Sequence, residues 1–182
     1  MEIRILQKQV KKCLNGDRNA QKALYGLIAP MMLSVAHRYA NNKPDAEDIF
    51  QESVLNVFDR LHQLREVEKI HGWAKQIVVH EAIRFYKKKR NMVFTDDTFS
   101  ETLKIEGDST IYKKIEMDQL LKIIQQLPDK MRMVINLYAI EGYKHEEIAD
   151  MLGISVGTSK SNLFDARKKI KVFMKEEERR LG

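Results

Sequence analysis

The stretch that decides the fold is KHEEIADMLGISVGTSKSNLFDARKKIK, residues 144–171. Apolar residues at helical spacing predict a short helix before Gly153 and a longer helix after it. Glycine suits the tight turn between them because it tolerates a positive φ angle. Ser155 is placed to cap the second helix, and Ala149 is small enough for the two helices to cross closely. The stretch therefore predicts a helix–turn–helix.

The second helix of this motif has an inner seam and a polar outer side. We expect the seam to comprise Val156, Ser159, Leu163, Ala166 and Ile170. In a helix–turn–helix the second helix enters the major groove, where lysine can meet phosphate or guanine and asparagine can recognise adenine. An ordinary helical hairpin on a charged surface is the alternative, but the glycine turn, the cap and the basic helix favour DNA binding. The candidate DNA contacts are Ser155, Thr158, Ser159, Lys160, Ser161, Asn162, Phe164 and Arg167.

Helical periodicity also dominates the N-terminal half. Residues 20–39 predict a helix that is interrupted or kinked near Pro30, because proline removes a backbone hydrogen bond. Residues 45–61 predict a second helix, with Asp45 as its N-cap. One broad apolar stripe runs along that helix, with polar residues on the opposite side. The stripe consists of Ile49, Phe50, Ser53, Val54, Val57, Phe58 and Leu61.

Residues 71–90 predict a third helix, with one apolar and one basic side. Five positive charges fall within the seven residues 84–90, which suits a DNA backbone or an extruded single strand. We expect Trp73 and Phe85 on the apolar side, where core packing is favoured over base stacking. A solvated helix face is the alternative explanation of the basic side. Its candidate DNA contacts are Gln76, His80, Arg84, Lys87 and Lys88.

The helical pattern stops between these two parts of the chain. Residues 92–110 are rich in threonine, serine and aspartate and have no lasting period, which is typical of a linker. Helical signal returns at about residue 111, stops at Pro128, and resumes over 131–140 before Gly142. We therefore predict an all-α protein of two small helical domains joined by a flexible acidic linker. The predicted ranges are 1–93, 94–110 and 111–182.

Composition narrows the class of protein further. The chain has 182 residues and a formal net charge of +6, which permits a nucleic-acid partner. Cys13 is the only cysteine, so a disulfide framework and a Cys-rich metal site are excluded. Packing is a more common role than redox sensing for such a cysteine. The sequence has neither an apolar run of membrane-spanning length nor a secretory segment, so we expect a cytoplasmic protein without membrane insertion.

The sequence offers no credible active site. Residues 153–157 match the G-x-S-x-G pattern of hydrolases, but that motif requires a preceding strand inside an α/β sheet. The five histidines are scattered, and no two lie four residues apart on a helix. We therefore expect no catalytic residue, no metal site and no cofactor, and predict that the protein is not an enzyme.

Two separated stretches together resemble a known family. DAEDIFQESVLNVFDRL (45–61) is followed by HGWAKQIVVHEAIRFYKKKR (71–90), and later by LPDKMRMVINLYAIEGYKHEEIADMLGISVGTSKSNLFDARKKIK (127–171). In this order, with an acidic linker between them, they resemble the two domains of a bacterial RNA polymerase sigma factor. The particular resemblance is to the extracytoplasmic-function group. It covers about four fifths of the chain.

The resemblance implies a transcription initiation factor that binds core RNA polymerase and directs it to promoter DNA. By similarity, Asp48, Gln51, Glu52 and Asn56 would dock on the coiled coil of the β′ clamp. Residues 71–90 and the preceding loop, 62–72, would open the minus-ten element and hold a flipped base. The second domain would bind the minus-thirty-five element and touch the β flap. An anti-sigma factor is a further partner of many members.

The sequence departs from the family at two places. His80 stands where the family usually has an asparagine, and Asp165 stands where arginine is frequent. Asp165 repels phosphate, so we do not carry a base contact over to it.

Two other functions remain as alternatives. An autonomous, dimeric helix–turn–helix regulator would use the same C-terminal motif, but leaves the polar side of 45–61 without a purpose. A DNA-processing enzyme such as a recombinase would need a grouped nucleophile in the first domain, and none is found.

Overall fold

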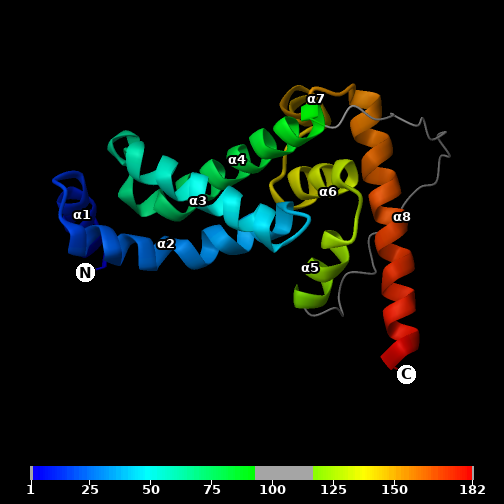
Figure 1. Cartoon of the computed structure of the whole chain (residues 1–182), viewed down its shortest axis with the longest axis horizontal. Helices are drawn as coiled ribbons and strands as arrows, with labels where there is room; N and C mark the ends of the chain where they lie inside the picture. Colours follow the sequence, from blue (N-terminus) through cyan, green and yellow to red (C-terminus); the bar gives the residue numbers. More distant parts are fainter. Residues whose placement is uncertain (1, 93–116, 182) are drawn as a thin grey trace. The chain divides into compact units, whose positions relative to one another are not determined.

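The computed structural model describes residues 2–92 and 117–181, and in these ranges every regular element is helical (Figure 1). The all-α prediction is confirmed. The chain divides into two compact units, Met1–Phe85 and Tyr86–Gly182. The predicted linker, 94–110, and the first residues of the predicted second domain, 111–116, lie outside the described residues.

The first unit is built from helices that pack side by side along the chain. α1 packs against α2, and α2 packs against α3, while α4 follows α3 after two short 3₁₀ turns. The large side chains of Leu24, Ile28 and Met32 are fully buried in this core. The elements are α1 (Glu2–Leu14), α2 (Arg18–Tyr39), α3 (Lys43–Asp59), η1 (Leu61–Gln63), η2 (Val67–Lys69) and the part of α4 (Ile70–Met92) up to Phe85.

α2 begins at a clear capping residue and runs through its proline. The Asp17 carboxylate accepts hydrogen bonds from the backbone N–H groups of Asn19 and Ala20, at 2.9 and 3.0 Å. The helix is not interrupted near Pro30, because it continues from Arg18 to Tyr39. Proline costs the helix one backbone hydrogen bond, but the burial of neighbouring Ala29 and Met32 favours continuing it.

α3 starts earlier than its sequence pattern predicts. Asn42 is the N-cap, since its side-chain oxygen accepts a hydrogen bond of 2.8 Å from the N–H of Asp45. The prediction of Asp45 as N-cap is therefore wrong. Pro44 occupies the first turn, where its missing N–H needs no partner, and this favours a cap on its N-terminal side.

The apolar stripe predicted for α3 faces the core only in part, since its Phe50, Val54 and Phe58 are half-buried. Ala46, Ile49, Ser53 and Val57 are all buried on this helix. The Ser53 hydroxyl donates to the Ile49 carbonyl at 2.6 Å, which satisfies it inside the core. α4 buries a matching stripe, which consists of Ala74, Ile77, Val78, Val79, Ala82 and Ile83.

Cys13 is buried in the first unit, 5% exposed. Its burial, and to a smaller extent the nearby Asp17 carboxylate, raise the pKa of the thiol. Because the thiolate is the reactive form, this environment favours packing over redox sensing.

The second unit is organised around its last helix, α8, against which α5, α6 and α7 all pack (Figure 1). The predicted helix over 131–140 instead comprises α6 and a wider π-helical turn, η4. Gly142 follows with a φ angle of +83°, a conformation that suits glycine. The elements are α5 (Met117–Gln125), α6 (Asp129–Ile135), η4 (Asn136–Ile140), α7 (His145–Leu152) and α8 (Val156–Leu181).

No helix within 2–92 or 117–181 combines the length and apolar character needed to cross a membrane.

A buried arginine joins α5 to α6. The Arg132 guanidinium donates to the Gln125 and Leu127 carbonyls, both at 2.8 Å, and to the Asp129 carboxylate at 2.6 Å. The Arg132 side chain is 3% exposed. The two carbonyls belong to the end of α5 and the turn after it, where carbonyl groups have no N–H donor within the helix. Arg132 therefore fixes the connection between these helices.

We predict that Arg132→Met lowers the free energy of unfolding of the second unit by about 3 kcal/mol, because two carbonyls and a carboxylate lose the hydrogen bonds that Arg132 donates. Hydrogen–deuterium exchange of α6 amides measures this, with α2 amides as an internal reference. Lys168→Met, on the exposed side of α8, is the control and should leave exchange unchanged. α6 exchange as slow as in the unmodified protein would contradict the assigned role.

Candidate nucleic-acid and protein interfaces

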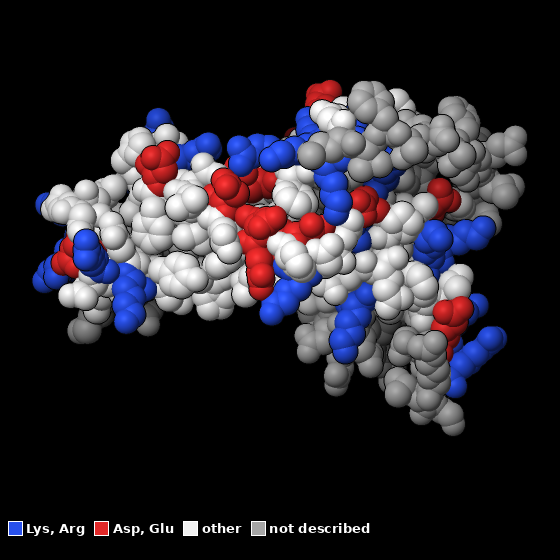
Figure 2. All heavy atoms as spheres, in the orientation of Figure 1, with Lys and Arg blue, Asp and Glu red and all other residues white. Residues whose placement is uncertain are grey.

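The outer side of α3 carries the residues predicted to bind a protein partner. Asp48, Gln51 and Glu52 are exposed, and Asn56 is half-buried. Leu55 lies among them and is 65% exposed, so the polar face has an apolar centre that the sequence analysis missed. Its spacing from Asp48, Gln51 and Glu52 was the available signal, since residues three, four and seven apart share a helix face. Figure 2 shows acidic side chains gathered over α3.

α4 carries the predicted basic face. Gln76, His80, Arg84 and Lys88 are exposed, and Lys87 is half-buried. Figure 2 shows basic side chains over α4, beside the acidic cluster over α3. Such a row of cations can follow a nucleic-acid backbone by neutralising successive phosphates.

Side chains link the outer face of α3 to α4. Asn56 Nδ2 donates to a Glu81 carboxylate oxygen at 3.0 Å, and the other oxygen of Glu81 accepts from Arg84 Nε at 2.8 Å. Arg84 Nη2 also lies 3.5 Å from the Glu52 carboxylate. Glu81 was not predicted from the sequence, because residue spacing along one helix does not indicate a hydrogen-bond partner on another helix.

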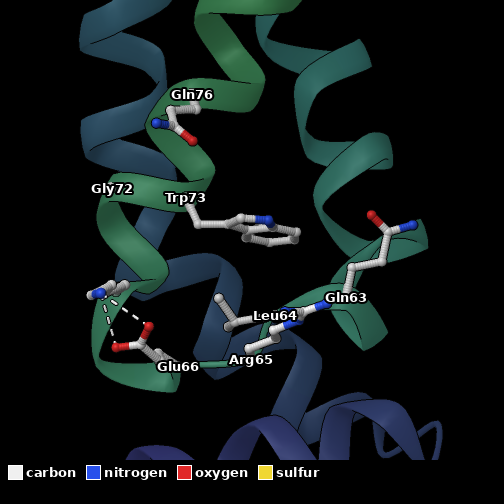
Figure 3. Close-up of a pocket in the computed structure, with 8 residues that line it drawn as sticks. Gln63, Leu64, Arg65, Glu66, Gly72, Trp73 and Gln76 are labelled. Carbon is white, nitrogen blue, oxygen red and sulfur yellow. Dashed lines mark hydrogen bonds and ion pairs between the residues drawn. The ribbon is translucent and has the colours of Figure 1, made fainter.

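A hollow of about 570 Å³ opens where the loop after α3 meets the start of α4. The half-buried Trp73 ring projects from α4 into this space, and Gln76 lies one turn above it (Figure 3). Trp73 is therefore not simply a core residue. An ion pair between Lys69 and Glu66, at 2.9 Å, stands at the rim. The lining residues are Gln63, Leu64, Arg65, Glu66, Lys69, Gly72, Trp73 and Gln76.

The helix–turn–helix forms as its sequence predicts. Gly153 ends α7 in the left-handed region, with φ +65° and ψ +46°. Ser155 caps α8 by accepting a hydrogen bond of 2.9 Å from the N–H of Thr158. Ile148, Ala149 and Leu152 are buried on α7, and Leu163 is among those buried on α8.

One predicted DNA contact is removed by this packing. Ser159 is fully buried, and its hydroxyl lies 2.9 Å from Nδ1 of His145 on α7. The side chain points into the seam between the two helices, so Ser159 as a DNA contact is wrong. The sequence had already placed it on the inner seam by its helical spacing.

The remaining residues of the α8 set differ in how freely they can reach a ligand. Lys160 and Arg167 are exposed, as is the capping residue Ser155, whereas Thr158, Ser161, Asn162 and Phe164 are half-buried. Ser161 and Asn162 both donate to the Thr158 carbonyl, at 3.1 and 2.8 Å. Lys160 and Arg167 are therefore the strongest candidates to meet phosphate, because their charges project from the helix.

A ring stack supports Arg167 and joins it to α7. The Tyr138 and His145 rings stack with centroids 4.6 Å apart, and the Arg167 guanidinium carbon lies 5.7 Å from the Tyr138 centroid. These distances are within the range of ring stacking and cation–π attraction. Neither Tyr138 nor His145 was proposed from the sequence. The signal available in the sequence was an aromatic residue shortly before the motif.

The described parts of the chain, 2–92 and 117–181, bring no three histidine, cysteine, aspartate or glutamate side chains together in a metal-binding arrangement. The described residues do form charged helix faces and a hollow beside Trp73, which are features of a binding protein.

Comparison with known proteins identifies the family. Residues 24–92 match the family model of sigma-70 region 2, and residues 117–170 match that of sigma-70 region 4. The chain is 31% identical over 144 residues to RNA polymerase sigma factor SigV of Bacillus subtilis, covering 79% of this chain and 84% of SigV. It is 27% identical over 182 residues to the ECF sigma factor SigW of the same organism, covering 92% and 95% of the two chains.

A solved structure with a similar chain is the co-crystal structure of the sigma factor RpoE in complex with the anti-sigma factor NepR from Bartonella quintana. It matches with a TM-score of 0.48 and 22% identity, over 85% of this chain and 96% of that chain.

The chain belongs to the sigma-70 family, and it is a transcription initiation factor, not an enzyme. Within that family it is a member of the extracytoplasmic-function group, to which SigW also belongs. The autonomous-regulator alternative is not favoured, because both sigma regions are present in order.

The His145 ring provides a pH-dependent test of the second unit. Desolvation chiefly lowers the pKa of His145, the charges of Lys160 and Arg167 lower it further, and Glu146 opposes them. The folded state therefore favours neutral His145 more than the unfolded state does. The contribution of His145 to the free energy of unfolding is therefore complete at pH values above its pKa in the unfolded state, about 6.5. It declines as the pH falls through the pKa of the folded state.

We predict that the pKa of the His145 ring, followed by NMR, lies below the ordinary histidine value of about 6.5. His145→Gln should remove this part of the acid-dependent loss of stability of α7, measured by hydrogen–deuterium exchange between pH values on either side of the transition. The same acid dependence in the variant would contradict the role of His145.

Proposed function

We propose that the protein binds core RNA polymerase in the cytoplasm and directs it to promoters, with each candidate face in a separate role. The observation that carries this proposal is the pair of adjacent helices, α3 with an acidic outer face and α4 with a basic one, within the segment matching sigma-70 region 2. Such a pair of helices can bind a basic protein surface on α3 and a nucleic acid beside it on α4.

The polymerase contact is assigned to the outer face of α3. Its acidic residues Asp48 and Glu52 suit a basic partner, which by family resemblance is the coiled coil of the β′ clamp. Leu55 supplies the apolar centre, and an apolar anchor within a polar rim is the usual anatomy of a protein interface.

The minus-ten contact is assigned to α4 and the hollow at its start. The Trp73 ring offers a stacking surface, and Gln76 offers amide groups for the edge of a base (Figure 3). Extruding a base costs a few kcal/mol, which stacking and phosphate contacts must offset. Arg84, Lys87 and Lys88 supply the positive charge for the adjoining backbone.

The minus-thirty-five contact is assigned to α8, with Lys160 and Arg167 as its leading cations. The capped N-terminus of α8 adds N–H groups and a favourable dipole toward phosphate. Contact of the second domain with the β flap, and control by an anti-sigma factor, stay predictions from the family resemblance.

We expect the protein to co-elute with core RNA polymerase at one-to-one stoichiometry in gel filtration without DNA. Asp48→Arg should abolish co-elution, because it places a cation against the basic partner surface. The control is Glu47→Arg, because Glu47 lies on the same helix but pairs with Lys43, at 3.6 Å. Separate elution of the unmodified protein, with tight duplex binding by the protein alone, would overturn the proposal.

Single-stranded DNA should quench the fluorescence of Trp73, the only tryptophan, because a base stacks on its ring. Duplex DNA of the same sequence should quench it much less. Lys88→Gln should lower the slope of log affinity against log salt by about 0.7, the value for one lost single-strand phosphate contact. Lys43→Gln, which removes a lysine outside both DNA-binding faces, should leave this slope unchanged. Equal quenching by single strand and duplex would contradict the assignment of the hollow.

A further inference from the structure

Glu81 occupies a singular position between α3 and α4. Its side chain is 11% exposed, and each carboxylate oxygen has a different partner. One oxygen accepts from Asn56 at 3.0 Å and the other from Arg84 at 2.8 Å. Asn56 belongs to the face assigned to polymerase, and Arg84 belongs to the face assigned to DNA. Glu81 therefore bridges two functional surfaces without belonging to either.

Arg84 is shared between two carboxylates of unequal strength. The pair with Glu81 is short and joins a cation to a mostly buried carboxylate, so it should persist. The pair with Glu52 spans 3.5 Å, and both side chains are well exposed, at 65% and 58%. Exposed pairs of this kind are weak and screened by solvent, so Glu52 can be exchanged for another ligand.

We propose that Glu81 is a positioning residue that couples polymerase binding on α3 to DNA binding on α4, and this rests on the proposed function. In the free protein, the ion pair with Glu81 holds Arg84 close to Glu52. Glu52 then competes with a DNA phosphate for the outer side of the Arg84 guanidinium. A basic partner surface that pairs with Glu52 removes this competitor. Polymerase binding thus raises the affinity of Arg84 for DNA, and DNA must raise the affinity for polymerase by the same factor.

The first test uses the full chain alone and a 20-nucleotide single-stranded DNA of mixed sequence. Glu52→Gln should raise its affinity about threefold, the scale expected for an exposed ion pair. Glu47→Gln is the matched control, because it removes the same charge from the same helix, and Glu47 pairs with Lys43 instead of Arg84. Its effect should be clearly smaller.

A double-mutant cycle identifies the route of the effect. In an Arg84→Gln background, Glu52→Gln should give no gain, because the guanidinium for which they compete is gone. Glu81→Gln should also reduce the gain, because Arg84 is then no longer held beside Glu52. Thermal unfolding of each variant shows whether the first unit remains folded. A gain that persists without Arg84, or an equal gain from Glu47→Gln, overturns the proposal.

The second test measures the coupling itself. The dissociation constant of dye-labelled protein for core RNA polymerase is compared with and without the same DNA. Glu81→Gln should reduce the tightening that DNA causes, while Glu47→Gln should retain it. An unchanged ratio in Glu81→Gln overturns the coupling. Failure of the unmodified protein to bind polymerase overturns the proposed function instead, so the two failures are distinct.

Discussion

Burial of one stripe of α3 is the constraint on which the first unit depends. Ala46, Ile49, Ser53 and Val57 turn inward, and burying an aliphatic side chain such as Ile49 contributes about 1.5–3 kcal/mol. A helix has 3.6 residues per turn, so inward burial of these positions forces Asp48 and Glu52 outward. Rotating α3 to move this face would expose apolar groups and bury carboxylates without partners. The acidic face is thus a consequence of the core.

The same logic fixes the outer face of α8. Gly153 allows the chain to reverse tightly, and buried Ile148 and Leu163 set the contact of α7 with α8. The His145–Ser159 hydrogen bond adds a directional contact within that seam. Hydrogen bonds depend on angle as well as distance, so this contact restricts the rotation of α8 more than apolar packing alone does. The projection of Lys160 follows from it.

The sequence predicted what depends on local spacing. The helices, the α3 stripe, the turn at Gly153 and the Ser155 cap all follow from periodicity and turn chemistry. The cap of α3 was misplaced because both Asn42 and Asp45 are good capping residues, and only backbone geometry decides between them. Ser159 was misassigned because serine is as compatible with a buried helix contact, where its hydroxyl finds a hydrogen-bond partner, as with an exposed DNA contact. Glu81 and the Trp73 hollow depend on contacts between elements, which spacing along one helix does not encode.

Glu81 also changes how a loss of function at Arg84 must be interpreted. A mostly buried carboxylate is costly unless it is paired, and Arg84 and Asn56 supply its donors. Removing Arg84 therefore takes away a cation from the DNA face and leaves Glu81 without its charged partner. The lost cation and the unpaired Glu81 both lower the affinity for DNA. They differ in their effect on the stability of the first unit. Removing Glu81 together with Arg84 separates them, because the double change leaves no unpaired charge between the helices.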